Sequence, residues 1–495
     1  MTKSFKKPKK YTHNIVVIGA GAAGLVTSYI SAALKAKVAL IEKNKMGGDC
    51  LNYGCVPSKA LIRSAKVVHQ IQNAKKYGIH TAQCEFEFKD IMSRVHKIIK
   101  AIEPHDSVER YSRLGVECIE GAAKIISPYE VEVNGKILTT KAIVVATGAA
   151  PIVPKITGLE DIEYLTSDNL WELTELPKNL LVLGGGPIGC ELAQSFNRLG
   201  SKVTLLENSD TIMAREDQDV SAEITKKFQA EGIKLLTGYN TKSFQKTESG
   251  GTLIAKKNGE QKEIHFDKVL ISVGRRARVT GFGLEDLGVE LNKNGTVKVD
   301  DYLATNYKNI FVCGDVAGPY QFTHVAAHQA YYAAVNGLFL LLTRWAAPFA
   351  GKSVKAHYSV IPWATYTDPE VATVGLTEKT ALAHKIPYEL TKYGIDDLDR
   401  AIADDEAYGF VKVLTEPKSD KILGATIVGQ HASDMIGEFI CAMRFGFGLK
   451  SIMGTIHIYP TMSEANKYAA GAWSQARKPL GLLNILEKLH AWRRN

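Results

Sequence analysis

The sequence lacks an apolar run long enough to cross a bilayer. Its 495 residues are 45% hydrophobic and 23% charged, which is typical of globular proteins, whereas a membrane-spanning helix needs about 18 or more apolar residues in a row. Only a short apolar stretch, 15–18, follows the lysine-rich start, so the core of a secretion signal is also missing. We therefore expect a cytoplasmic protein, and its length predicts about three domains.

The sequence also lacks an excess of basic residues in its central part that would indicate nucleic-acid binding. The formal net charge is +9, but five lysines within 1–10 supply +5 of it and 477–495 supply a net +4. The chain between these ends is neutral, which argues against a groove for DNA or RNA.

Cysteine is scarce. Seven in a chain of this length do not make a disulfide framework. Only Cys50 and Cys55 are close in sequence, and we interpret the other five as small buried hydrophobic residues. Those five are Cys84, Cys118, Cys190, Cys313 and Cys441.

What the sequence does contain is an internal repeat. Segments 15–42 and 180–207 match at a constant offset of 165 residues. Each is read as a strand, a Gly-x-Gly-x-x-Gly turn, a helix, a second strand and a final glutamate. The first two glycines of such a turn let the backbone approach a pyrophosphate, the third lets helix and strand pack closely, and the helix N-terminus faces the phosphates. The glycines are Gly19, Gly21 and Gly24, and Gly184, Gly186 and Gly189.

The repeat predicts two dinucleotide sites, which suggests FAD plus NAD(P). Glu42 and Glu207 end the two segments, where each can accept hydrogen bonds from adenosine ribose hydroxyls. Glu207 also favours NAD(H) over NADP(H), because a 2′-phosphate would meet like charge and 208–210 contain no arginine.

Cys50 and Cys55 are read as a redox pair. In a regular helix this spacing gives about 7.5 Å of rise and splays the side chains, too far for a disulfide. A bridge therefore needs a distorted turn, which Gly54 permits, and a strained bridge is easily reduced. The alternatives are a zinc half-site, for which no second Cys or His pair is present, and two inert thiols.

These motifs together resemble the pyridine nucleotide-disulfide oxidoreductases, the family of dihydrolipoyl dehydrogenase, glutathione reductase and mercuric reductase, over about residues 12–470. The elements that carry the resemblance are Gly19–Gly24, Cys50–Lys59, Ala146–Gly148, Gly184–Glu191, Val273–Arg276, Cys313–Asp315 and Tyr366–Gly375. The resemblance implies an α/β fold with two Rossmann-like dinucleotide-binding domains and a C-terminal α+β dimerisation domain.

The resemblance also implies residue roles. Cys55 would lie against the flavin as the charge-transfer thiol, and Cys50 would exchange with the substrate. Lys59 would pair with Glu191 near the flavin N5, and a lysine one turn past Cys55 can lower the pKa of that thiol. A helix start within 321–330 would also favour a reduced flavin. Further cofactor contacts are expected from Gly48, Thr147, Gly148, Gly274 and, on the ribityl chain, Asp315.

Members of the family are homodimers, so a homodimer is expected here. The expected division is an FAD-binding domain in two parts, 1–155 and 280–348, an NAD(P)-binding domain, 156–279, a dimerisation domain, 349–475, and a basic amphipathic tail, 476–495. The stretch 347–353 is read as the last boundary.

The chain departs from the family at its expected base. Disulfide reductases of the family carry His-Pro-Thr followed by a glutamate, but Tyr459 stands where the histidine should be, ahead of Glu464. A phenol with a pKa near 10 is a poor proton shuttle compared with an imidazole near 6.5. His457 could replace the base if the segment is extended, although a structural histidine is the preferred interpretation.

With a tyrosine at the position of the histidine base, this chain resembles mercuric reductase. The leading hypothesis is therefore a mercuric-reductase-like enzyme that passes electrons from NAD(P)H through FAD to Cys50 and Cys55 and on to a thiophilic metal ion or a disulfide. We expect this enzyme to differ from mercuric reductase in having no metal-carrying N-terminal domain and no vicinal cysteine pair near the C-terminus. The alternatives are a dihydrolipoyl dehydrogenase with an unusual base and a membrane- or partner-docked redox protein without small-molecule turnover. No resident metal is expected.

The last segment, 479–495, is amphipathic. Its apolar stripe consists of Leu482, Ile485, Leu486, Leu489 and Trp492, with basic residues nearby. Packing on the chain's own dimerisation domain is the preferred interpretation, and docking on an anionic membrane or a partner is the alternative.

Overall fold

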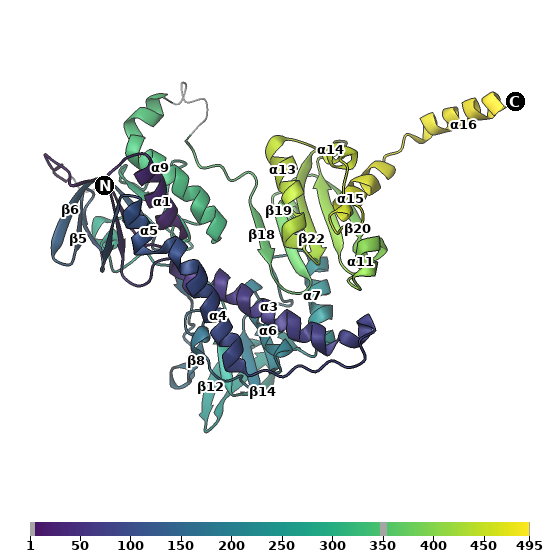
Figure 1. Ribbon diagram of the computed structural model, residues 1–495, viewed down its shortest axis with the longest axis horizontal. Coiled ribbons are helices and arrows are strands. Elements are labelled where there is room, and N and C mark those ends of the chain that lie inside the picture. Colours follow the sequence, from purple (N-terminus) through teal and green to yellow (C-terminus); the bar gives the residue numbers. More distant parts are fainter. Residues whose placement is uncertain (1–4, 347–353, 495) are drawn as a thin grey trace. The chain divides into compact units, whose positions relative to one another are not determined.

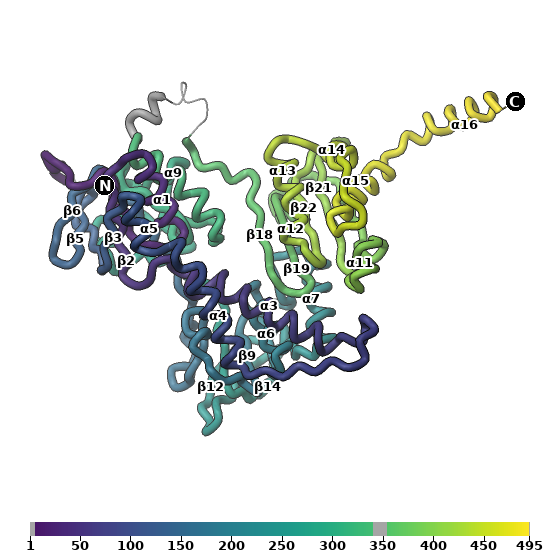
Figure 2. The backbone as a smooth tube through the Cα atoms, viewed as in Figure 1, coloured from purple at the N-terminus to yellow at the C-terminus, as the bar shows by residue number. Residues whose placement is uncertain are grey.

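The computed structural model describes residues 5–346 and 354–494. The chain forms two compact units, one from residues up to 209 and 233–357, the other from 210–232 and 358 onward. Figures 1 and 2 show their elements along the chain. The predicted boundary at 347–353 lies outside the described residues.

The first repeat forms the centre of the largest sheet. Strand β1 (His13–Ile18) pairs in parallel with β2 (Val38–Glu42), and helix α1 (Ala22–Ala33) connects them. Ile15 and Val17 face one hydrophobic cluster, while Val16 and Ile18 face the other. Both faces of the strand are therefore buried, which is why it is apolar without alternation. The βαβ unit predicted from the sequence is confirmed.

The rest of this sheet is mixed. Its order is β3-β2-β1-β6-β5-β4, and β17 also pairs with β6. The pairs β2/β3, β1/β6 and β6/β17 are parallel, whereas β4/β5 and β5/β6 are antiparallel. The added strands are β3 (Val116–Glu120), β4 (Lys124–Ser127), β5 (Glu130–Val133), β6 (Lys136–Val145) and β17 (Ile310–Val312).

Helices of the same unit include the one that begins at Cys55. The helices are α2 (Gly48–Asn52), α3 (Cys55–Gln72), α4 (Phe88–Ile102), α5 (Val108–Arg113), α8 (Leu284–Leu287) and α9 (Thr323–Ala346). Short 3₁₀ turns are η1 (Ala74–Tyr77), η2 (Glu103–Asp106), η3 (Leu159–Asp161) and η4 (Leu170–Glu172). The expected helix start within 321–330 is confirmed by α9.

The second repeat builds a separate five-stranded sheet in the order β11-β10-β9-β15-β8, all of whose pairs are parallel. Its βαβ unit is β9 (Asn179–Leu183), α6 (Pro187–Arg198) and β10 (Lys202–Glu207), again as predicted. The other strands are β8 (Tyr164–Leu165), β11 (Lys234–Thr237) and β15 (Lys268–Ile271). Smaller sheets contain β12 (Asn240–Thr247), β13 (Gly250–Lys257) and β14 (Glu260–Phe266), and β7 (Ala149–Pro151) with β16 (Arg275–Ala277).

The other unit is an antiparallel sheet with helices, in the strand order β18-β19-β22-β21-β20. Its strands are β18 (Pro362–Thr365), β19 (Glu370–Gly375), β20 (Glu389–Gly394), β21 (Phe410–Thr415) and β22 (Ile422–Gly429). Its helices are α7 (Gln218–Ala230), α10 (Glu378–Ala383), α11 (Asp399–Ala403), α12 (Ala432–Met435), α13 (Gly437–Phe445), α14 (Leu449–Gly454), α15 (Glu464–Gln475) and α16 (Leu480–Arg494), with the 3₁₀ turn η5 (Ile395–Asp397). The α/β fold class is confirmed.

A fully buried lysine joins three segments of this unit. The Nζ of Lys412 in β21 lies 2.7 Å from Asp217 Oδ2, 2.7 Å from Asp219 Oδ1 and 3.0 Å from Glu378 Oε1. Burial acts to lower the pKa of Lys412, but the hydrogen bonds to these carboxylates outweigh it and the pKa is raised. The three carboxylates are close enough to hold a cation, and the ammonium group of Lys412 serves as that cation.

Two expectations were wrong. No residue of α16 is buried, so the tail does not pack on its own unit, and Figure 1 shows no other element alongside it. Cys441 is exposed, and Cys84 and Cys118 are only partly buried, whereas Cys190 and Cys313 are buried as expected. Among the described residues, no helix is long and apolar enough to span a membrane.

Candidate active site

The two glycine turns have nearly the same backbone. Gly19 has φ +102° and Gly184 has φ +108°, a region that favours glycine. A Cβ on Gly24 would collide with the Gly19 carbonyl oxygen, and one on Gly189 would collide with that of Gly184. The third glycine of each turn is therefore needed for close packing of helix and strand, as the sequence predicts.

The glutamates that end the repeats hold these turns. Glu42 Oε2 accepts a hydrogen bond from the Ala20 N–H at 2.6 Å, and Glu207 Oε2 accepts one from the Gly185 N–H at 2.6 Å. Each Oε1 accepts a second bond at 2.8 Å, from the N–H two residues later. The carboxylates are thus fixed at the ends of their strands. Sequence reasoning found both residues but missed this backbone role.

The surroundings of the two turns differ. The backbone of Gly48, with φ +55°, lies so close to Gly21 that a Cβ on Gly48 would meet the Gly21 Cα at 2.5 Å. A Cβ on Gly21 would lie 3.9 Å from the Gly48 Cα, whereas one on Gly186 would meet no described atom within 4 Å. The cysteine segment therefore covers the first turn, and the second turn is open.

The helix is broken between the two cysteines. Helix α2 ends at Asn52 and α3 begins at Cys55, and the carbonyl oxygen of Asp49 accepts bonds from the N–H groups of Tyr53 at 2.8 Å and Gly54 at 2.7 Å. This is the distorted turn expected at Gly54. The two cysteines are not bridged in the structure, and each side chain shifts the pKa of the other.

The two thiols have opposite acidities. The hydrogen bond from Cys50, with smaller contributions from Thr323 and the positive charge of Lys59, outweighs burial and lowers the pKa of Cys55 to about 6. The same contact and burial raise the pKa of Cys50 well above its usual range. At neutral pH, Cys55 therefore carries the thiolate and Cys50 the proton.

Helices α3, α6 and α9 meet at Cys55. Lys59 Nζ of α3 lies 2.9 Å from Glu191 Oε2 of α6, and the Glu191 side chain is only 7% exposed. Thr323 Oγ1, at the start of α9, lies 3.5 Å from Cys55 Sγ. Sequence reasoning missed Thr323, although it lies within the helix start expected at 321–330.

The remaining predicted cofactor residues lie in the same unit. Gly148 and Gly274 have positive φ, and Thr147 Oγ1 donates a hydrogen bond to the Arg278 carbonyl at 2.7 Å. Burial raises the pKa of the Asp315 carboxyl. Arg275 Nη2 lies 3.0 Å from Asp49 Oδ2, next to Cys50. This ion pair joins the cysteine segment to the strand β16, and it was not predicted.

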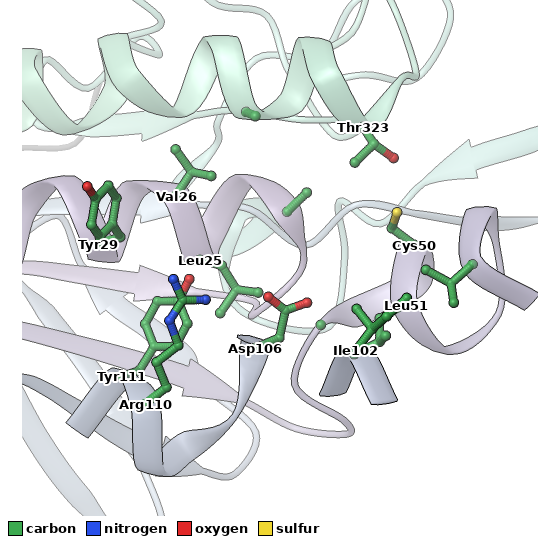
Figure 3. Close-up of a pocket in the computed structure, with 14 residues that line it drawn as sticks. Leu25, Val26, Tyr29, Cys50, Leu51, Ile102, Asp106, Arg110, Tyr111 and Thr323 are labelled. Carbon is green, nitrogen blue, oxygen red and sulfur yellow. The ribbon is translucent and has the colours of Figure 1, made fainter. Parts of the chain in front are cut away.

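A cavity of about 430 Å³ adjoins Cys50. Figure 3 shows Cys50 and Thr323 at one end, Tyr29, Arg110 and Tyr111 at the other, and Asp106 between them. Burial raises the pKa of Asp106, and it raises the pKa of Tyr111 to about 12. The rest of the lining is mainly aliphatic, from Ala22, Leu25, Val26, Leu51, Val56, Ile102 and Ala327.

In the other unit, Tyr459 and His457 have different partners. The Tyr459 hydroxyl donates a hydrogen bond to Asp399 Oδ2 at 2.9 Å. This bond and the negative charge of Asp399 raise the pKa of the phenol. His457 Nε2 lies 3.0 Å from Glu438 Oε1, and its Nδ1 lies 3.1 Å from the Thr455 carbonyl. Both ring nitrogens of His457 are therefore engaged in the structure. Glu464 Oε2 accepts from the Thr461 N–H at 3.1 Å.

Comparison with known families decides the relationship. The model described as "Pyridine nucleotide-disulphide oxidoreductase" matches residues 13–330, and the dimerisation-domain model of the same name matches residues 361–470. The chain belongs to this family. This pyridine nucleotide-disulphide oxidoreductase is accordingly an FAD-dependent, NAD(P)H-using enzyme.

Its relatives include enzymes with different acceptors. Mercuric reductase of Bacillus cereus is 34% identical over 464 residues, which are 93% of this chain and 71% of that protein. Dihydrolipoyl dehydrogenase of Chlamydia pneumoniae is 34% identical over 470 residues, which are 94% and 97% of the two chains. The Cu(II) complex of the HOCl-induced flavoprotein disulfide reductase RclA from Escherichia coli is similar in structure, with a TM-score of 0.80, 26% identity and coverage of 94% and 99%.

The dimerisation-domain match supports a homodimer. Within it, large apolar side chains are exposed on the single chain: Phe445 by 71%, Phe447 by 55%, Ile456 by 94% and Ile458 by 78%. Exposed apolar groups on this scale mark protein contact surfaces. Tyr459 follows Ile456 and Ile458 directly in this exposed segment.

Proposed function

We propose that the chain passes electrons from NADH through FAD to Cys55 and Cys50, and from these sulfurs to a thiophilic metal ion such as Hg(II) or Cu(II). The observation that carries the proposal is the hydrogen bond from Tyr459 to Asp399, which leaves the expected base position without a group that titrates near neutral pH. We therefore favour an acceptor whose reduction needs no proton donor at the position of Tyr459.

The residues around the first turn fit FAD. The N-terminus of α1 has no side-chain cap, so its N–H groups are suited to a pyrophosphate. The contact of Gly48 with Gly21 closes this cradle from the side of the cysteine segment, and Glu42 is fixed at the end of β2 for a ribose. FAD supplies two-electron transfer between a nicotinamide and a disulfide when it is bound. We assign Gly19, Gly24, Thr147, Gly148, Gly274 and Asp315 to the same site.

The acidities of the two thiols suit a division of labour. Cys55, the more acidic, holds the negative charge beside Lys59, and Glu191 fixes the position of the lysine through their 2.9 Å contact. Cys50 keeps its proton and adjoins the 430 Å³ cavity. We therefore assign Cys55 to the flavin side and Cys50 to exchange with the acceptor.

Proton balance favours a metal ion over a disulfide. Reduction of a disulfide by NADH consumes one proton and needs an acid for the leaving thiolate. Reduction of Hg(II) to Hg(0), or of two Cu(II) to two Cu(I), takes the same two electrons from NADH and releases one proton. A phenol whose pKa is raised above 10 is a poor acid for the first reaction, and the second does not need one.

A small apolar disulfide is the second candidate. The aliphatic lining of the cavity beside Cys50 favours such a substrate, as in a dihydrolipoyl dehydrogenase with an unusual base. We rank it second because the cavity also admits a metal ion, whereas the missing base affects only the disulfide reaction.

We further propose NADH as the preferred donor. Glu207 at the second turn is fixed by the N–H groups of Gly185 and Ser209, so its carboxylate cannot turn away readily from a 2′-phosphate. Like charge at this position disfavours NADPH.

Anaerobic turnover tests the acceptor. The holoenzyme, reduced with NADH, is mixed separately with Hg(II), Cu(II), lipoamide and oxidised glutathione, and flavin reoxidation is followed with the proton change in weakly buffered solution. We expect rapid reoxidation by Hg(II) or Cu(II) with release of one proton per NADH. Rapid reoxidation by lipoamide or glutathione disulfide alone, with proton uptake, would overturn the proposal.

A further inference from the structure

Helix α16 exposes all of its large apolar side chains. Leu480, Leu482, Leu483, Ile485, Leu486, Leu489 and Trp492 are between 37% and 74% exposed, and no residue of the helix is buried. A 15-residue helix without tertiary contacts is only marginally stable in water. The helix therefore needs a surface to cover its apolar side.

Most of these side chains share one face. Leu482, Ile485, Leu486, Leu489 and Trp492 recur three or four residues apart and form a stripe about 120° wide. Leu480 lies on the opposite side and Leu483 beside the stripe. The exposed fraction of Trp492 is 74%, and tryptophan is favoured where one side of a ring is apolar and the other meets water.

The charges of the helix are mainly positive. Lys488, Arg493 and Arg494 stand against the single acid Glu487. Lys488 lies beside one edge of the stripe, and Arg493 lies on the stripe in the last turn of the helix. Long basic side chains at these positions can place their charges in water while their stems cover apolar surface. This combination is typical of helices that lie in the plane of an anionic lipid surface.

We propose that α16 docks the enzyme on an anionic lipid bilayer, with the stripe in the interface and the basic side chains at the headgroups. Pairing of α16 with the same helix of a second copy would bring like charges together, so charge favours lipid over a second copy. A homodimer has two such helices, and attachment through both raises the overall affinity without any new contact. The helix adds a peripheral attachment that is separate from the redox site.

Vesicle co-sedimentation of the holoenzyme tests the proposal. We expect the full chain to pellet with vesicles in which phosphatidylglycerol replaces part of the phosphatidylcholine, and to remain in the supernatant with phosphatidylcholine alone. Leu489→Glu should weaken binding by about tenfold or more, because it places a charge within the stripe. The matched control Leu480→Glu introduces the same charge on the opposite side and should bind at least half as tightly as the unaltered enzyme.

Flavin absorbance and NADH oxidation should be equal in all three forms, which shows that folding is intact. The proposal is overturned if Leu489→Glu binds as tightly as the unaltered chain, if neutral vesicles bind equally well, or if neither vesicle binds. It is also overturned if the enzyme without lipid sediments as an assembly larger than a dimer and Leu489→Glu restores the dimer, since that identifies a second copy as the occupant.

Discussion

The two glycine turns of this enzyme have the same local geometry and different neighbours. Both have glycines with φ near +105° and a glutamate that accepts the same two backbone N–H bonds. The first turn is covered by the backbone of Gly48, and the second has no described neighbour within 4 Å of a Cβ on Gly186. An enclosed turn suits a cofactor that stays bound, and an open one suits a coenzyme that exchanges at every turnover.

The second glycine of each turn gives the sharpest test and the largest expected effect. Gly21 and Gly186 have φ −78° and −77°, which alanine adopts readily, and neither Cβ would collide with the protein. Any effect of alanine therefore reports on the bound nucleotide. We expect Gly21→Ala to lose nearly all flavin, measured by the ratio of absorbance at 450 nm to that at 280 nm. Gly186→Ala should keep its flavin, and equal flavin loss in both variants would contradict the comparison.

The second effect concerns the open turn alone. Gly186→Ala should raise the KM for NADH about tenfold or more, which is about 1.4 kcal/mol of binding free energy, because the methyl group meets the pyrophosphate. Its kcat should change less than its KM, since the thiol site is intact. Steady-state kinetics with saturating acceptor checks this, and a fall in kcat with unchanged KM would show that the second turn does not bind NADH.

The third effect concerns the Cys55 thiol, where α3 meets α6, the helix that follows the second turn. The thiolate of Cys55 forms as pH rises through about 6, so its long-wavelength absorbance with the flavin should be lost as pH falls through that value. Cys50→Ala removes the largest contribution that lowers the pKa, and Lys59→Met removes a smaller one. We expect the midpoint to move upward in both variants, by about one pH unit or more for Cys50→Ala and by less for Lys59→Met.

Controls for that titration use the other thiol. Cys55→Ala should lack the band at every pH, whereas Cys50→Ala keeps it at high pH. A band that persists in Cys55→Ala would reverse the assignment of the two thiols.

A smaller effect distinguishes the nucleotides of the two turns. Glu207→Gln removes the charge and keeps one oxygen, which can accept one of the two backbone N–H bonds of the turn. We expect kcat/KM for NADPH to rise several-fold relative to NADH. The matched change Glu42→Gln in the first turn should leave the ratio of NADPH to NADH use unaltered. If Glu42→Gln changes that ratio and Glu207→Gln does not, the first turn binds the nicotinamide coenzyme and the assignment of the two sites is reversed.

The smallest effect is expected outside both turns. Tyr459→Phe removes the hydroxyl bound to Asp399. If Tyr459 is not the base, turnover with a metal ion should stay within about twofold of the unaltered enzyme, with the same pH profile. Loss of an alkaline limb from that profile would show that the phenol does exchange protons.

The sequence predicted the parts of the fold that follow from local chemistry. The glycine turns, their strands and helices, and the broken helix at Gly54 each depend on residues within a few positions, so pattern alone located them. Contacts between distant segments were not accessible in this way. Thr323 is 268 residues from Cys55, and the pairing of Arg275 with Asp49 depends on how β16 lies beside the cysteine segment.

The C-terminal helix was misjudged for a different reason. Its amphipathic pattern shows that one face must be covered but not by what, and packing on the same chain is the commoner solution. Sequence pattern also does not determine whether a single cysteine is buried. Cys313 is buried and Cys441 is exposed because the fold gives them different neighbours.

The ion cluster of Lys412 shows that the C-terminal fold is not a module that can be cut out. Two of its three carboxylates, Asp217 and Asp219, come from a segment more than 120 residues upstream of β18. A fragment that starts after 357 keeps Glu378 but leaves the ammonium group without these two partners, and breaking such a buried pair costs about 3 to 5 kcal/mol. Gene fragments designed from the dimerisation-domain limits alone should therefore be poorly stable, and fusing 210–232 back onto them should restore their folding.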